Sequence, residues 1–138
     1  MIRIEPKPWA AMVAHARQAY PDECCRAMLG AVEDGRKVVC EALPLENAFE
    51  GARAIRYRIR PEDAVQAGAA ARRRGMDLIG FYHSHPDCDA RFSETDIKNS
   101  WPWYSFVVLS IRNGDLHHAN SWLPNFEQTE AAQEELTH

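Results

Sequence analysis

The sequence LIGFYHSHP, at residues 78–86, indicates a buried strand with a pair of chemically useful side chains at its end. Residues 78–82 are almost continuously apolar, which is typical of a strand covered on both faces of its sheet. His83 and His85 follow at alternate positions, so both imidazoles point to one side, at the edge of the sheet. Pro86 then ends the strand. The segment therefore predicts two histidines held side by side.

Two imidazoles and a carboxylate are ordinary zinc ligands, and ten residues separate the second histidine from Asp96. Three protein ligands leave a fourth position for water, which defines a catalytic rather than a structural site. Ser93 precedes Asp96 by three residues, in the pattern of a helix capping box. The two roles of Asp96 are compatible, because a short helix starting near Ser93 can carry it toward the metal. We therefore predict a metal site formed by His83, His85 and Asp96.

On either side of this segment the chain predicts two helices and several strands. Apolar residues recur at helical spacing in residues 8–20, and Pro61 occupies a favoured first-turn position of a second helix. An Asp-Gly pair at 34–35 and an Asn-Gly pair at 113–114 predict tight turns. The expected helices span residues 8–20 and 61–75, and the expected strands span residues 1–4, 24–32, 37–43, 55–59, 106–111 and 116–122. The fold class is therefore α/β, a mixed β-sheet flanked by helices in one domain over residues 1–138.

Composition and charge exclude several classes of protein. The chain has 138 residues, 46% of them hydrophobic, and a formal net charge of -4. No apolar run is long enough to cross a bilayer and no signal peptide is evident, so we expect a cytoplasmic protein with no membrane partner. The negative charge argues against nucleic-acid binding, since the arginines at 72–74 fit the last turn of a helix. The glutamate-rich residues 124–138 predict a solvated tail or frayed terminal helix.

Other polar and aromatic side chains receive structural interpretations. The four cysteines are expected as free thiols, with Cys24 and Cys25 on opposite faces of a strand and Cys88 in the loop after the histidines. His117 and His118 are adjacent on a strand, so at most one faces the site, and surface exposure is favoured. The aromatic residues before the strand at 106–111 are expected in the core: Trp101, Trp103 and Tyr104.

The pattern His-x-His, ten residues, then Asp resembles the signature of the JAMM metallopeptidases, also called MPN-plus or Mov34 proteins. His83 and His85 match the two histidines, Asp96 matches the aspartate, and Ser93 matches the serine three residues before it. The resemblance extends over nearly the whole chain and is closest to the small, stand-alone bacterial and archaeal type. It implies the JAMM/MPN architecture, which is similar to that of cytidine deaminases, and one Zn²⁺ ion per chain.

The family also has a glutamate on the segment after the first helix, and Glu23 matches it. The resemblance implies that Glu23 is the general base and that Ser93 donates a hydrogen bond to the tetrahedral oxyanion. The chain departs from the family at Arg26, where bacterial members usually have glycine. We expect this cation to narrow the substrate groove or to contact an acidic partner.

The resemblance implies hydrolysis of a peptide or isopeptide bond after the C-terminal Gly-Gly tail of a ubiquitin-like protein, such as a sulfur carrier. Because the histidines end a strand, we expect the tail to bind beside the metal as an added strand. Two alternatives stay open: a catalytically silent MPN scaffold, and a non-haem iron enzyme with the same triad. A zinc deaminase is excluded, since its His-x-Glu and Pro-Cys-x-x-Cys motifs are absent. A homodimer stays open, and the sequence names no particular substrate.

Overall fold

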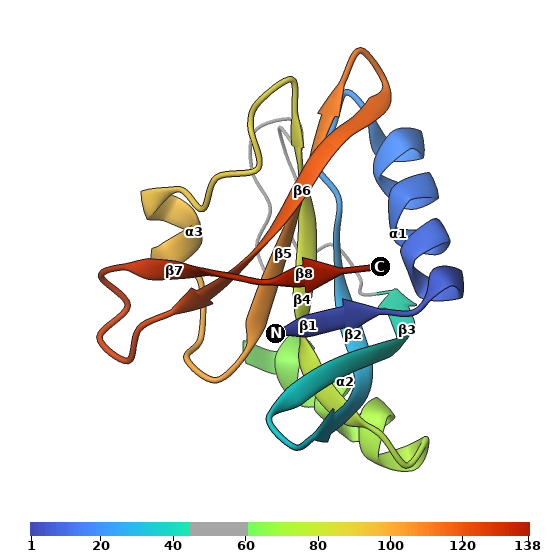
Figure 1. Cartoon of the computed structure of the whole chain (residues 1–138), viewed down its shortest axis with the longest axis vertical. Coiled ribbons are helices and arrows are strands. Elements are labelled where there is room, and N and C mark those ends of the chain that lie inside the picture. Colours follow the sequence, from blue (N-terminus) through green and yellow to red (C-terminus); the bar gives the residue numbers. More distant parts are fainter. Residues whose placement is uncertain (45–60) are drawn as a thin grey trace.

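The structure is a computed structural model, which describes residues 1–44 and 61–138 (Figure 1). The strand expected at residues 55–59 lies outside this part. Within it, one mixed sheet has the strand order β7-β6-β5-β4-β2-β3-β1-β8, and no helix is long and apolar enough to cross a membrane. The strands are β1 (Ile2–Ile4), β2 (Cys25–Glu33), β3 (Arg36–Pro44), β4 (Asp77–Pro86), β5 (Ser105–Arg112), β6 (Asp115–Pro124), β7 (Ala131–Glu134) and β8 (Leu136–Thr137). The helices are α1 (Pro6–Ala19), α2 (Pro61–Arg73) and α3 (Glu94–Lys98).

The structure contains the helices and hairpin turns for which the sequence has a strong local pattern. Met12 and Ala16 of α1 are buried, as the helical spacing requires. The hairpin turns at 34–35 and 113–114 have positive φ at both residues, which matches the Asp-Gly and Asn-Gly preference of such turns. Arg72 and Arg73 lie in the last turn of α2. The α/β fold class, with a single domain and helices beside a mixed sheet, is confirmed.

The strand β4 is interior to the sheet and runs further than the apolar run alone predicts. It is antiparallel to β2 and parallel to β5, and it continues through both histidines to Pro86. His83 is paired with Cys25 on one side and with Val108 on the other. The expectation that the histidines lie at an open lateral edge is therefore wrong, because β4 has a neighbour on both sides at His83.

The two faces of β4 belong to different hydrophobic clusters. Ile79 and Tyr82 pack in the cluster that includes α1, whereas Phe81 packs in the cluster that includes α2. From Phe81 onward the side chains alternate, so His83 and His85 share the face of Phe81. We call this side of the sheet the α2 face and the opposite side the α1 face.

An irregularity at Gly80 sets this alternation. A Cβ atom at Gly80 would lie 1.9 Å from the backbone oxygen of Ser105, so no other residue permits this approach of β4 to β5. The partner strand β2 shifts register at residues 28–29, opposite the same position. A shift by one residue changes the face of every later side chain. The local irregularity therefore decides that the histidines face α2.

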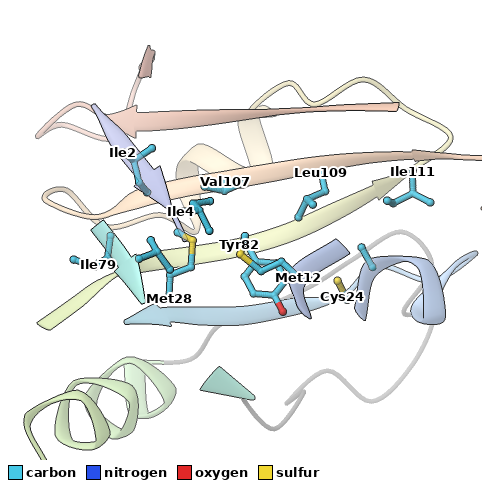
Figure 2. Packing of buried hydrophobic residues seen from close by; sticks show 12 residues of the cluster. Ile2, Ile4, Met12, Cys24, Met28, Ile79, Tyr82, Val107, Leu109 and Ile111 are labelled. Atoms are coloured by element: carbon cyan, nitrogen blue, oxygen red, sulfur yellow. The ribbon is translucent and has the colours of Figure 1, made fainter. Parts of the chain in front are cut away.

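The larger hydrophobic cluster lies between the sheet and α1 (Figure 2). Met12 of α1 packs there with Tyr82 of β4, and the β5 side chains of Leu109 and Ile111 extend the cluster along the sheet. The smaller cluster on the α2 face contains Ala27, Ala67, Phe81 and Phe106. Each cluster anchors one helix, which fixes the strand that carries the histidines.

Residues 124–138 are not a frayed helix, so that expectation is wrong. β7 pairs with β6 and β8 pairs with β1, and only Glu135 separates the two strands (Figure 1). Glu134 is buried and accepts hydrogen bonds from the hydroxyls of Ser105 (2.7 Å) and Ser121 (2.9 Å). These bonds satisfy a carboxylate that burial would otherwise destabilise. The segment is thus an integral part of both ends of the strand order.

Candidate metal centre

Three side chains from two elements meet on the α2 face. His83 and His85 come from β4, and Asp96 comes from α3. The Nε2 atoms of the two histidines are 3.1 Å apart. Oδ2 of Asp96 lies 3.4 Å from Nε2 of His83 and 3.3 Å from Nε2 of His85. The structure therefore brings together the three residues that the sequence predicts as ligands.

These distances fit a shared metal ion. Ligand atoms at ~2.0–2.1 Å from a tetrahedral zinc ion lie ~3.3–3.4 Å from one another by geometry. Nδ1 of His85 is 2.9 Å from the backbone oxygen of Asp89, which can only accept, so this nitrogen carries the ring proton. Nε2 of His85 is then the unprotonated nitrogen and points at the other two donors. The residues present could hold a metal ion with three protein ligands, which leaves the fourth position of a tetrahedral ion to a water or a substrate.

Protonation of the three residues is set by burial and by their mutual contacts. Burial lowers the pKa of His83, which favours the neutral imidazole that binds metal. At Asp96 burial acts to raise the pKa, but the charge of His83 and hydrogen bonds from both histidines hold it well below its usual range. At His85 burial acts to lower the pKa, but hydrogen bonds to Asp96 and to the Asp89 backbone raise it. Of the two histidines, His85 is therefore the one that retains a proton more readily.

The short helix α3 carries Asp96 in its first turn. Ser93 Oγ accepts from the backbone N–H of Asp96 at 3.0 Å, and Oδ2 of Asp96 accepts from the backbone N–H of Ser93 at 2.9 Å. This is a complete capping box. The same Asp96 oxygen faces both histidines. The capping interpretation and the metal interpretation of Asp96 are thus compatible in one geometry.

Glu23 lies just before β2 and interacts electrostatically with His85 and Asp96. Burial raises its pKa to about 7, with the charge of His85 opposing this shift and the charge of Asp96 adding to it. The carboxylate is therefore close enough to both residues to respond to their charges. Within residues 1–44 and 61–138, its buried Oε2 atom has no hydrogen-bond partner. The fold thus brings a carboxylate whose Oε2 has no hydrogen-bond partner among the described residues within electrostatic range of His85 and Asp96, although sixty residues separate it from His83 in the sequence.

Arg26 does not lie at the site. It is paired in register with Tyr82, one residue before His83, so its side chain points to the α1 face. There its guanidinium lies against the ring of His15, with Nη2 3.0 Å from Nε2. The expectation that Arg26 narrows a groove beside His83, His85 and Asp96 is therefore wrong, because strand alternation turns its side chain to the opposite face. Contact of Arg26 with an acidic partner stays a prediction.

The structural interpretations of the cysteines are confirmed, whereas those of the aromatic residues are confirmed only in part. All four cysteines are free, Cys24 is buried in the cluster beneath α1, and Cys25 packs on the opposite face, as expected. Trp101 and Tyr104 pack against Phe81, but Trp103 is 80% exposed and is not a core residue. The exposed Phe126 is its aromatic neighbour, with ring centroids 6.1 Å apart.

The sequence did not predict a set of hydrogen bonds from β6 to the loop between His85 and Asp96. His118 is half-buried and its Nε2 accepts from the backbone N–H of Ala90, so the expectation of exposure is wrong for this residue. Asn120 and Trp122 donate to the backbone oxygen of the same alanine. Their period-two spacing on β6 is the only local sign that they share one face. Their target could not be found without the three-dimensional pairing of the strands.

The fold and the grouping of His83, His85 and Asp96 define a class of protein, the JAB/MPN domains, and comparisons with known proteins agree. The family model of prokaryotic homologues of the JAB domain matches residues 6–124. The chain belongs to this family, which confirms the JAMM resemblance. A JAB1/MPN domain protein from Archaeoglobus fulgidus has the same fold, with a TM-score of 0.60 and 17% identity over 100% of this chain and 98% of that one.

Several relatives are more similar in sequence. Desampylase from Haloferax volcanii is 33% identical over 105 residues, which are 72% of this chain and 73% of that protein. The CysO-cysteine peptidase of Mycobacterium tuberculosis is 30% identical over 113 residues, 81% of this chain and 75% of that protein. A solved protein from Desulfitobacterium hafniense has a TM-score of 0.83 and 28% identity over 99% of this chain and 91% of its own. The chain is therefore a hydrolase of the JAMM type.

Proposed function

We propose that this protein is a zinc-dependent metallopeptidase that cleaves the bond after the C-terminal Gly-Gly tail of a ubiquitin-like protein of the sulfur-carrier kind. The observation that carries the proposal is the convergence of His83, His85 and Asp96, with the Glu23 carboxylate within electrostatic range of His85 and Asp96. The names of two relatives, a desampylase and a CysO-cysteine peptidase, support a protein-conjugate or protein-tail substrate.

In this proposal the zinc ligands are His83, His85 and Asp96. A bound zinc ion would lower the pKa of a water and polarise the scissile carbonyl. Glu23, with a pKa raised to about 7, is suited to take a proton from that water and to return one to the leaving amine near neutral pH. The buried Oε2 of Glu23 is available for this transfer, since no hydrogen bond from the described residues occupies it.

Ser93 is the proposed donor to the oxyanion. Its Oγ accepts one hydrogen bond, from the N–H of Asp96, so the hydroxyl proton is directed elsewhere. The side chain is exposed at the start of α3, where a substrate carbonyl can reach it. A hydroxyl in this position would stabilise the charge that develops on the carbonyl oxygen.

The tail does not add as a strand beside His83 in this proposal, because β2 and β5 already occupy both sides of β4 there. It approaches over the α2 face, where the donor atoms point. A glycine tail has no side chains, so it can bring a main-chain carbonyl close to a buried metal. This accounts for a preference for Gly-Gly without requiring a specificity pocket.

The test is mass spectrometry of a ubiquitin-like sulfur carrier with residues added after Gly-Gly, incubated with zinc-loaded enzyme. We expect a single cleavage after the second glycine, and at least about tenfold slower cleavage when either glycine is replaced by Val. A matched lysine-linked conjugate distinguishes tail trimming from isopeptide cleavage. Equal cleavage of the Val variants, or cleavage elsewhere, would contradict the substrate. Iron rather than zinc in protein purified without added metal would contradict the cofactor.

A further inference from the structure

The loop of residues 87–93 connects the two elements that carry the metal ligands, and we call it the ligand loop. It begins after β4, which bears the histidines, and ends at Ser93, the N-cap of α3. Its central residue, Ala90, is fully buried, with 0% of its surface exposed. A buried residue in a loop must satisfy its backbone N–H and C=O groups without the pairing that a strand or helix provides. The partners of Ala90 therefore show how the loop is fixed.

Side chains of β6 supply all of these partners. The N–H of Ala90 donates to Nε2 of His118 at 3.0 Å. The oxygen of Ala90 accepts from Nδ2 of Asn120 at 3.2 Å and from Nε1 of Trp122 at 3.0 Å. The three residues occupy alternate positions on β6, so they project from one face of the strand. We call them the β6 clamp.

The β6 clamp and the metal ligands stand in the same rows of the sheet. Register pairs place Asn120 opposite Val108, which is in turn opposite His83. A second row contains His118, Ser110 and His85. Side chains of residues paired across strands lie on the same face. The clamp therefore reaches the ligand loop from the α2 face, two strands away from the ligands themselves.

One peptide group joins the clamp directly to a ligand. Nδ1 of His85 donates to the oxygen of Asp89 at 2.9 Å. That oxygen and the N–H of Ala90 belong to the same planar amide, so fixing one fixes the direction of the other. The hydrogen bonds thus run from the His85 ring, through the Asp89–Ala90 amide, to Nε2 of His118. Bonds in such a chain polarise and strengthen one another.

Other contacts hold the start of the ligand loop but do not reach this amide. The hydroxyl of Ser110 donates to the oxygen of Cys88 at 2.5 Å, and Arg112 forms an ion pair with the side chain of Asp89. Tyr20 donates to the carboxylate of Asp87 at 2.7 Å. The amide that receives His85 is oriented on its N–H side by His118.

We propose that His118 is a positioning residue of the metal centre, which orients the His85 ring through the Asp89–Ala90 amide, while Asn120 and Trp122 fix the following amide. The inference rests on the proposed function only in taking His83, His85 and Asp96 as the metal ligands. Partners that orient a metal-bound histidine typically change metal affinity by about 10–100-fold when removed. His118 therefore acts on metal binding without touching the metal.

The test measures zinc affinity by competition with a chromophoric chelator. His118→Phe keeps a ring of similar size but cannot accept a hydrogen bond, and we expect it to weaken zinc binding by about 10–100-fold. His118→Gln offers an amide oxygen as acceptor, and we expect its affinity to stay within about threefold of the parent. Asp115→Ala, on β6 but paired with Arg17 away from the loop, is the matched control and should bind zinc as the parent does.

A second variant keeps the proposal testable if His118→Phe does not fold. Asn120→Ala with Trp122→Phe removes both donors to the Ala90 oxygen while it keeps an aromatic ring stacked near Phe92. We expect about a tenfold loss of zinc affinity and a changed absorption spectrum of the cobalt-substituted protein. Far-UV circular dichroism of the metal-free proteins should not change.

Two results would overturn the proposal. One is parental zinc affinity in both His118→Phe and the double variant. The other is an equal loss in His118→Phe and His118→Gln, which would assign the effect to packing rather than to the hydrogen bond. His83→Ala is measured beside them: full zinc affinity in that variant would show that the proposed metal site itself is wrong, which is a separate failure.

Discussion

His15 of α1 and His83 of β4 lie on opposite sides of the sheet, and both are held as neutral imidazoles. Burial lowers the pKa of each, to about 4 at His15, where the charge of Arg26 adds to the effect. Nδ1 of His15 is 3.1 Å from the hydroxyl of Tyr82. Nε2 of His83 is instead 3.1 Å from Nε2 of His85 and 3.4 Å from Oδ2 of Asp96. Burial makes both rings neutral, and the neighbouring atoms decide which one can bind a metal.

The sequence alone does not separate these two histidines by their surroundings. Tyr82 and His83 are adjacent on β4, and Arg26 and Cys25 are adjacent on β2, yet each pair is divided between the two faces. The polar contacts of His15 and the proposed metal site are thus served by strand residues that are one position apart. Variants on the two faces should therefore affect different measured quantities.

The largest contrast is expected between the ligands and His15. Replacing His83, His85 or Asp96 by Ala should reduce zinc content by at least about tenfold and abolish turnover, because three ligands cannot be reduced to two without losing the site. His15→Ala should leave zinc content unchanged and lower the free energy of unfolding. Elemental analysis with urea unfolding checks both. Full zinc occupancy in His83→Ala together with His85→Ala would remove the distinction between the faces.

Glu23→Gln should lower kcat by about 10²–10⁴-fold, because the amide has a similar shape but cannot take a proton. Zinc content should stay at the parental level, since Glu23 is not one of the three ligands. Steady-state kinetics and elemental analysis of one preparation separate the two effects. A variant that cleaves as fast as the parent would mean that another group is the base.

Ser93→Ala should lower kcat by about 10²–10³-fold through the lost oxyanion donor. The same change removes a helix cap, which costs about 0.5–2 kcal/mol of stability. Ser93→Thr keeps both the hydroxyl and the cap, and Ser93→Gly keeps most of the cap without the hydroxyl. Turnover should follow the hydroxyl across the three variants. If it follows the melting temperature instead, Ser93 serves only α3.

The pH dependence of stability should reveal His15. Its folded pKa of about 4 lies below its ordinary value of 6.5, so the unfolded chain binds more protons between these values. The free energy of unfolding should therefore fall as the pH decreases from 6.5 to 4, by about 1–2 kcal/mol more than in His15→Gln after allowing for solvent screening of this half-buried ring. Urea titrations at several pH values check this. Parallel curves for the two proteins would show that His15 does not titrate in this way.

The smallest effect on catalysis is expected at Arg26. Because its side chain lies on the α1 face, Arg26→Gln should change kcat/KM by less than about twofold, within the range typical of substitutions away from a site. Its effect should appear at His15, as a weaker fall in stability with decreasing pH. A clear rise in KM would show that Arg26 reaches the substrate after all.

The convergence of His83, His85 and Asp96 could be predicted because its signal is local. Two histidines at alternate positions after an apolar run must share a face, and the serine three residues before Asp96 forms a capping box by its spacing alone. Glu23 depended on the family resemblance, since no local pattern connects it with residues sixty positions away. Which face of the sheet the Arg26 side chain occupies became clear only from the register of β2 against β4.

Two features could not be predicted from local patterns. β7 and β8 are short and rich in polar residues, and Glu134 is buried only because hydroxyls from two other strands meet it there. The contacts of His118, Asn120 and Trp122 depend on two successive strand pairings and on the path of a loop. Such long-range geometry leaves only a period-two spacing in the sequence.

The short segment of β7 and β8 links the two ends of the strand order, so we expect these ends to open together. A typical open sheet has two lateral edges that fray independently, and amide hydrogen exchange at one edge says nothing about the other. Here both outermost strands are parts of one segment, joined by Glu135. If that segment detaches, amides of β6 and of β1 lose their partners in the same event. Protection at the two ends of the strand order should therefore decay with one shared rate.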